Sequence, residues 1–261
     1  MKTLRLLTVG GYLSFRALFG WLNPYLYLLT LLVPALTQLA FFVFLGRAAH
    51  VASDSYYVSG NALLAAVAPG LWGMSQAIAG ERYAQTLGLL VASPAPRTVV
   101  FLGRALPATV NGFVVSAWTF VIAALIFRVH IPASAIGSLA AAILITAFSC
   151  VGIGLFNAAL GLRWRETGVL GNFLLYVLLL FAGVNIPLDR LPGWLSTFAQ
   201  GIPVTHGAKA TREVIAGASF THVGGLLAAE ALVGACYALV GITALAFFER
   251  EARARATLEL A

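Results

Sequence analysis

Long apolar runs without a charged residue, separated by short charged segments, dominate the chain. A helix needs about 20 apolar residues to cross a hydrocarbon core of about 30 Å, so each run predicts a membrane-spanning helix. The runs are continuously apolar and lack the alternation that is typical of membrane-barrel strands. Six spans are predicted, near residues 22–45, 57–80, 105–127, 133–160, 168–188 and 223–248.

Composition agrees with this pattern. Hydrophobic residues make up 61% and charged residues 10% of the 261 positions, against about 45–50% and about 25% in soluble domains. A soluble fold could not bury so much apolar surface. Cys150 and Cys236 lie inside apolar runs and offer neither a disulfide framework nor a zinc motif. His206 and His222 lie in predicted outer loops without a cluster of other ligands, so no metal site is expected. The chain is therefore predicted to be an all-α polytopic membrane protein.

The basic residues orient the predicted bundle. Cytoplasmic loops collect Lys and Arg, and an N-terminus inside the cell places eleven basic residues on the cytoplasmic side and five outside. Both termini are therefore predicted to be cytoplasmic. In a soluble protein, a net charge of +7 would suggest binding to nucleic acid. In a membrane protein the basic residues instead set the orientation of the spans, so no nucleic-acid partner is expected.

The stretch GERYAQTLGLLVASPAP, residues 80–96, interrupts the pattern in the first predicted cytoplasmic loop. Its Glu81 and Arg82 come directly after 26 residues without a charge. Residues 81–92 can form about three helical turns with an apolar face, and Pro94 and Pro96 end that helix abruptly. Such a helix can connect two spans, pack on them, lie in the lipid interface or dock a soluble partner, and the residues alone leave these choices open.

This stretch resembles the cytoplasmic coupling segment of type-2 ABC exporter permeases of the daunorubicin-resistance-permease-like group. In that family a pattern like E-R-E-x-G-T-L-E-x-L-L-x-S-P precedes the third span. Tyr83, Gln85 and Gly88 depart from it, standing where the family has Glu, Gly and Glu. The resemblance implies that residues 81–97 contact a separate ATPase subunit. The expected contact residues are Glu81, Arg82, Tyr83, Thr86, Leu87, Leu90, Ser93 and Pro94.

A second stretch, GVNIPLDRLPGWLSTFAQGIPVTHGAKATRE at residues 183–213, resembles the segment after the fifth span of the same family. The resemblance implies short helices that re-enter the outer leaflet over residues 189–213. Apolar residues there repeat at helical spacing, but over too short a length to span a membrane. An ordinary amphipathic outer loop is the alternative. The residues that carry this match are Pro187, Leu191, Pro192, Trp194, Pro203, Thr205 and Arg212.

Polar residues inside spans usually hydrogen-bond a neighbouring helix, so structural glue is the default interpretation for them. In the resembled family, spans two and five line the dimer seam that substrates use. The resemblance therefore implies a mixed polar and aromatic substrate pathway. Its expected members are Asn61, Gln76, Asn172, Phe173, Tyr176, Phe181 and Asn185.

Glu230 is the one charged residue within the six predicted spans. An acid inside a bilayer is costly and marks a functional site by default, so it is added to the predicted pathway. Two functional roles are open: attraction of a cationic substrate, or bonding to the re-entrant segment. A water-exposed acid near the outer rim is the alternative.

The resemblance covers essentially the whole chain and implies its function. Residues 1–261 would form one permease domain, with an interfacial helix over residues 1–20, although a disordered basic tail is also open there. The chain contains no G-x-x-x-x-G-K-[ST] motif. It is therefore expected to be no enzyme and to bind no cofactor, with ATP and Mg²⁺ held by a partner ATPase.

The implied assembly is an exporter in a bacterial plasma membrane, built from two permease copies and two ATPase subunits. It would move an amphipathic drug or lipid-like molecule and thereby support multidrug efflux and antibiotic resistance. An exporter permease for polysaccharide or lipid-linked glycan is the alternative within this architecture. An ion-coupled secondary transporter would need more buried ionisable residues and internal repeats. An intramembrane enzyme would need a convergent catalytic set that the sequence lacks.

Overall fold

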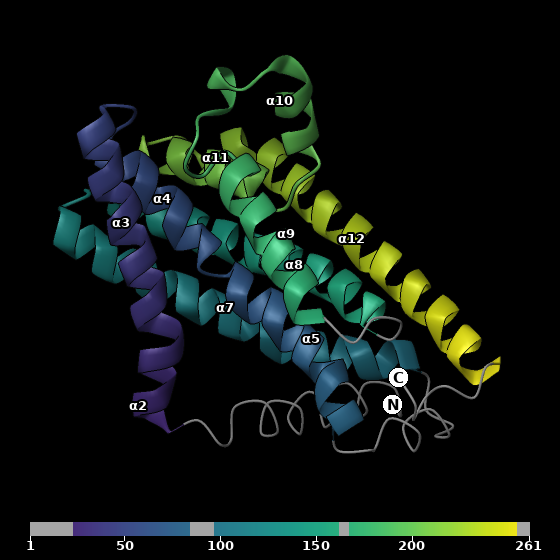
Figure 1. Ribbon diagram of the computed structural model, residues 1–261. Helices are drawn as coiled ribbons and strands as arrows, with labels where there is room; N and C mark the ends of the chain where they lie inside the picture. The colour runs from purple at the N-terminus through teal and green to yellow at the C-terminus, as the bar shows by residue number, and fades with distance from the viewer. Residues whose placement is uncertain (1–22, 84–96, 162–166, 255–261) are drawn as a thin grey trace.

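The computed structural model describes residues 23–83, 97–161 and 167–254, and every regular element within these ranges is helical. The helices run along one another, with α10 at one end of the bundle and the end of α5 at the other (Figure 1). The elements are α2 (Pro24–Tyr27), the π-helix η1 (Leu28–Leu32), α3 (Val33–Ala49), α4 (Asp54–Leu64), α5 (Val67–Tyr83), α7 (Arg97–Phe127), the 3₁₀-helix η2 (Ala133–Ala135), α8 (Ile136–Leu160), α9 (Thr167–Phe181), the 3₁₀-helix η3 (Leu188–Arg190), α10 (Gly193–Gln200), α11 (Thr205–Ile215) and α12 (Phe220–Ala254).

Within the described residues, four helical stretches are long and apolar enough to cross a membrane. They fall on the first, third, fourth and sixth predicted spans, and α9 contains a shorter apolar stretch, Gly168–Phe181. Large apolar side chains on the outside of the bundle, such as Phe41 and Phe247, are about three-fifths exposed. Together, the long apolar helices and their exposed apolar side chains are typical of a multi-pass membrane protein.

The second predicted span is two helices rather than one, because α4 ends at Leu64 and α5 begins at Val67. The cause is Pro69, which has no N–H to donate to the carbonyl of Ala65 and whose ring would clash with it. Within α5, Pro69 occupies the first turn, where backbone N–H groups have no intrahelical partner. The prediction of one continuous helix over 57–80 overlooked this proline.

The fifth predicted span is also shorter than expected. The sequence predicted a span to residue 188, but α9 ends at Phe181. Gly183 then adopts a positive φ of 68°, a conformation that glycine reaches without strain. The chain continues without regular structure to η3, and this stretch of open backbone supplies part of the candidate site.

Helix α8 lies at the centre of the bundle, and two-thirds of its apolar stretch is buried. Small residues let its neighbours approach closely. A Cβ on Gly154 would collide with the carbonyl of Gly70 in α5, and a Cβ on Gly152 would collide with the carbonyl of Gly234 in α12. The bundle is therefore held by backbone-to-backbone packing around α8.

Candidate functional site

The coupling segment predicted from the sequence lies mostly outside the described residues. The backbone of residues 81–83, which includes Glu81, Arg82 and Tyr83, is helical and continues α5. The other predicted contacts, Thr86, Leu87, Leu90, Ser93 and Pro94, lie outside the described residues, as does the predicted interfacial helix over residues 1–20. The coupling role of this segment stays a prediction.

The open backbone after α9 is held by side chains from two other helices. Arg212 of α11 donates from Nη2 to the carbonyls of Gly183 and Val184, at 2.9 and 3.3 Å. Tyr56 of α4 donates its hydroxyl to the same Gly183 carbonyl at 2.7 Å. We call these four residues the Arg212 clamp. The clamp provides hydrogen bonds for carbonyls that no helix satisfies.

Inside the Arg212 clamp, the guanidinium lies on the face of the Tyr56 ring, 3.6 Å from its centroid. A cation over an aromatic face is stabilised by the quadrupole of the ring, most strongly where water is excluded. Burial lowers the pKa of the Arg212 guanidinium from its ordinary value, yet arginine remains charged in proteins. Gly60 makes the approach possible, because a Cβ there would lie 2.9 Å from Arg212 Nη2.

Two members of the predicted substrate pathway meet next to the clamp. Asn61 donates from Nδ2 to Asn185 Oδ1 at 2.8 Å and to the carbonyl of Tyr57 at 3.0 Å. Asn185 in turn donates to the carbonyl of Leu179 at 3.2 Å. Asn61 is buried, so this pair links α4 to the end of α9 as interhelical glue does.

Other predicted pathway residues lie on exposed surfaces. Phe173 and Tyr176 of α9 are each 61% exposed, and Asn172 beside them is exposed as well. Gln76 is exposed on α5. Phe181 is half-buried, with its ring 6.4 Å from that of Phe198 in α10. The structure therefore separates a partly buried amide pair, Asn61 and Asn185, from an exposed aromatic face on α9.

Glu230 is fully buried on α12, so the alternative of a water-exposed acid is wrong. Its two carboxylate oxygens accept hydrogen bonds from the backbone N–H groups of Val204, at 2.7 Å, and Gly207, at 3.0 Å. These groups form the N-terminus of α11, where a negative charge is favourable. Of the two functional roles left open by the sequence, the structure shows the bond to the segment before span six.

The start of α11 is tightly constrained around this carboxylate. Val204, the residue before α11, has a φ of 77°, which is unusual for a β-branched side chain. A Cβ on Gly207 would collide with Thr146 of α8. Strained backbone persists only where its surroundings hold it, and here Glu230 and α8 hold it together.

The proline breaks of the predicted re-entrant segment coincide with the starts of helices. Pro187 precedes η3, and Pro192 precedes α10. Trp194 in α10 is 73% exposed, whereas Leu191 is half-buried. In contrast to Trp194, both Pro203 and Thr205, at the start of α11, are buried. The segment is thus short helices with an exposed aromatic side, and its depth in a membrane stays a prediction.

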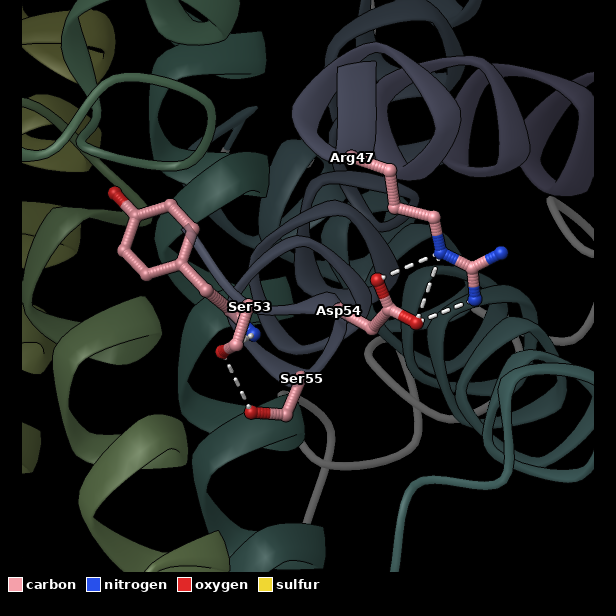
Figure 2. A network of polar contacts seen from close by, with 5 residues as sticks. Arg47, Ser53, Asp54 and Ser55 are labelled. Carbon is pink, nitrogen blue, oxygen red and sulfur yellow. Dashed lines mark hydrogen bonds and ion pairs between the residues drawn. The ribbon is translucent and has the colours of Figure 1, made fainter. Parts of the chain in front are cut away.

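An ion pair that the sequence did not predict joins α3 to α4 (Figure 2). Arg47 donates from Nε to Asp54 Oδ1 at 3.0 Å and from Nη2 to Oδ2 at 2.5 Å. These hydrogen bonds hold the pKa of the Asp54 carboxyl below its ordinary value. Next to it, Ser53 caps α4 by accepting the N–H of Tyr56, and its hydroxyl lies 3.2 Å from that of Ser55.

Among the described residues, two cavities flank Arg212. The first, of about 410 Å³, lies between α11 and the open backbone after α9. The second, of about 580 Å³, lies between α11, the start of α4 and the turn after α7. Sequence reasoning noted Arg212 only as part of a family match. Tyr56 gave no signal, because its partner is a backbone carbonyl 127 positions away.

Comparisons with known proteins agree with the membrane architecture. The sequence profile of the family described as "ABC-2 type transporter" matches residues 16–216 of the chain. The chain is 29% identical over 144 residues to the "Probable multidrug ABC transporter permease YbhR" of Escherichia coli strain K12. That match covers 54% of the chain and 38% of the relative's length. The protein of the same name from Escherichia coli O157:H7 gives the same figures.

Proposed function

We propose a function from one premise: this chain belongs to the ABC-2 type transporter family. It is a type-2 ABC permease, and we propose that it is the membrane-spanning subunit of an ATP-driven exporter. The observation that carries the proposal is the family match over residues 16–216. The sequence contains no phosphate-binding G-x-x-x-x-G-K-[ST] loop, which supports a transporter subunit that relies on ATP hydrolysis by another chain.

The proposed topology has six spans in a bacterial plasma membrane, with both termini in the cytoplasm. In it, α4 and α5 together make the second span and α9 makes the fifth. The segment from η3 to α11 re-enters from the outer side. Support comes from the clamp, because open backbone at membrane depth is tolerated where protein covers it and bonds its carbonyls.

The proposed energy input comes from two copies of an ATPase subunit that bind ATP and Mg²⁺. Their closure would push on the segment after α5 in each of two permease copies. The direct continuation of α5 into residues 81–83 supports this route, because a continuous helix transmits a push along its axis. Alternating access would then be a shift between two packed states that nucleotide biases.

The proposed cargo is an amphipathic drug or lipid-like molecule. The exposed face of α9, with Phe173 and Tyr176 beside Asn172, would supply the mixed aromatic and polar seam between two copies. A relative named as a multidrug permease supports the drug side of this proposal.

The test is reconstitution with an ABC ATPase subunit that copurifies with this chain. Wild-type vesicles should export amphipathic dyes upon addition of ATP. Glu81→Arg or Leu87→Asp should leave the permease folded and the ATPase active, yet abolish ATP-driven export. The control is Glu213→Arg, a charge reversal on α11 at the opposite end of the bundle. Normal export by both coupling variants would refute the coupling role, and export of glycans but not dyes would refute the proposed cargo.

A further inference from the structure

The cavity of about 410 Å³ beside Arg212 combines a cationic wall with an apolar wall. Lys209 and Arg212 line it from α11, and they stand three residues apart on one face of that helix. Pro187, Leu188 and Leu226 line it with apolar groups. We propose that this cavity binds the anionic group of an amphipathic molecule, a phosphate or a carboxylate, with its apolar part against Leu188 and Leu226.

Arg212 carries the argument, because it is a largely buried cation without an acidic partner. Among the described residues, its hydrogen bonds go to the carbonyls of Gly183 and Val184, and its π contact goes to Tyr56. These groups are neutral, so they solvate the guanidinium without cancelling its charge. Its Nε is buried and has no acceptor within the described part of the chain.

A buried charge without a counter-ion is costly, and proteins normally pair it. The missing negative charge can be supplied by a ligand in the adjoining cavity. A carboxylate or phosphate matches the donor geometry of arginine better than a neutral group does. The unpaired guanidinium therefore indicates a ligand of negative charge.

The charged groups that line the cavity, Arg212 included, sum to a positive charge. Lys209 is exposed at the mouth, and no ion pair joins it to a described residue. Asp189 is the acidic residue that lines the cavity, against two basic residues. His206 also lines it, with Nε2 2.9 Å from the carbonyl of Gln200. The lining thus carries a net positive charge whatever the state of this histidine.

The second cavity, of about 580 Å³, is also lined by two basic residues, Arg128 and Arg212, but Lys209 does not line it. The acidic residue of this second cavity, Asp54, is bound by Arg47 through three hydrogen bonds. Glu230 does not line the first cavity, and its two oxygens accept hydrogen bonds from backbone N–H groups. The inferred site takes an anion, and the sequence-based hypothesis that Glu230 attracts a cationic substrate stays a prediction.

This inference concerns binding, and it holds whether the anionic amphiphile is a resident lipid or exported cargo. The test uses the purified full chain in dodecyl maltoside, with three probes at pH 7.5: dodecyl phosphate, dodecyltrimethylammonium and inorganic phosphate. Ligand that binds the folded state raises the unfolding temperature as its concentration increases. Dodecyl phosphate should raise that temperature, and the other two probes should have little effect.

Matched variants locate the site. Lys209→Gln should weaken dodecyl phosphate binding about fivefold, the value of one partly exposed charge. Asp189→Asn should strengthen it by a similar factor. Arg190→Gln is the control, because Arg190 is exposed next to Asp189 but does not line the cavity. Arg212→Lys keeps the charge and loses the planar fork, so binding should weaken while the fold is kept.

Equal stabilisation by the phosphate and ammonium probes would overturn the proposal, as would equal losses in Lys209→Gln and Arg190→Gln. Stabilisation by inorganic phosphate alone would overturn its amphipathic part. With the ATPase subunit added, cargo should stimulate ATP hydrolysis, whereas a resident lipid should bind without stimulating it. Absence of a working ATPase partner would remove the proposed export function and leave the binding titration intact.

Discussion

The predicted spans two and five are both interrupted, but the two breaks are built differently. The first, between α4 and α5, follows from one residue, Pro69, and lies among fully buried neighbours such as Ala66 and Val67. Its backbone groups are hydrogen-bonded locally, because the N–H groups of Ala65 and Ala66 donate to carbonyls a few residues earlier. This break needs no side chain from elsewhere in the bundle to provide those bonds.

At the second break, after α9, the backbone carbonyls are hydrogen-bonded by side chains of other helices. The carbonyls of Gly183 and Val184 are bonded by Arg212 and Tyr56, which belong to two other helices. Arg212 is itself positioned by α11, whose start is fixed to α12 by Glu230. The first break therefore depends on residues nearby in the sequence, whereas the second depends on hydrogen bonds from helices far away in the sequence.

The largest effect is expected at Glu230, which fixes the start of α11 and thereby the position of Arg212. Glu230→Ala leaves the N–H groups of Val204 and Gly207 buried without an acceptor, which should destabilise the protein by about 4 kcal/mol. Glu230→Gln keeps one acceptor and should cost about half as much. The midpoint of unfolding in a titration with sodium dodecyl sulfate measures both, with Glu213→Gln as the control for loss of charge.

A readout at α11 separates a local positioning role from a general loss of stability. Thr211 is fully buried, so a Thr211→Cys reporter, in a chain lacking Cys150 and Cys236, should resist a water-soluble maleimide. Adding Glu230→Gln should make this reporter reactive under conditions in which the rest of the protein stays folded. Unchanged protection would show that α11 does not depend on Glu230.

The next effect is expected at the Arg212 clamp itself. Arg212→Ala removes donors from two carbonyls and should cost about 3 kcal/mol, because hydrogen bonds from a charged donor contribute more than neutral ones. Arg190→Ala, on the exposed η3, should change the unfolding midpoint very little. If both variants unfolded at the same midpoint, the second break would not rely on the clamp.

A pair of substitutions compares the two breaks directly. Pro69→Ala should change stability by less than about 1 kcal/mol, since the hydrogen bonds at the first break come from its own neighbouring residues. Gly183→Ala should cost about 2 kcal/mol, because Gly183 has a φ of 68° and a Cβ there would lie 2.9 Å from Leu188 Cγ. Equal costs in the same titration would remove the distinction drawn between the breaks.

The smallest effect is expected at the exposed Arg47–Asp54 pair, which ties α3 to the start of the first interrupted span. The pKa of Asp54 is lowered from 3.8 by its hydrogen bonds from Arg47. The pair therefore stabilises the protein fully above that value, and this contribution is lost as pH falls through the lower pKa of the folded state. Asp54→Asn should abolish that pH dependence, while the profiles of mutant and wild type should converge at lower pH.

Much of the fold could be predicted from periodicity and charge alone. The runs at 105–127, 133–160 and 223–248 lie within α7, within η2 and α8, and within α12, because an uninterrupted apolar run of this length has no other stable form in a membrane. The errors fall at spans two and five. Pro69 predicts a break in span two, and the prediction of one helix did not use it. At the end of α9, the nearby sequence feature that favours a helix end is Gly183.

The candidate site was less predictable than the fold. A resemblance drew attention to Pro187, Trp194 and Thr205, and the structure places them around short helices. Asn61 and Asn185 were grouped for a pathway, and they are in fact hydrogen-bonded to each other. Asn172 and Gln76 lie on exposed surfaces of different helices, because a sequence shows which residues are polar but not which way a helix turns.

Hydrophobic length and local motifs are properties of consecutive residues, so they were enough to identify a helical membrane protein of the ABC-2 type. The roles of the isolated charges became visible in the packing of the helices. Glu230 binds the start of α11, and Arg212 holds the open end of α9 beside a cavity without a counter-ion. The effect of a charge in a low-dielectric interior depends on partners a few ångströms away, and those partners come from helices far apart in the chain.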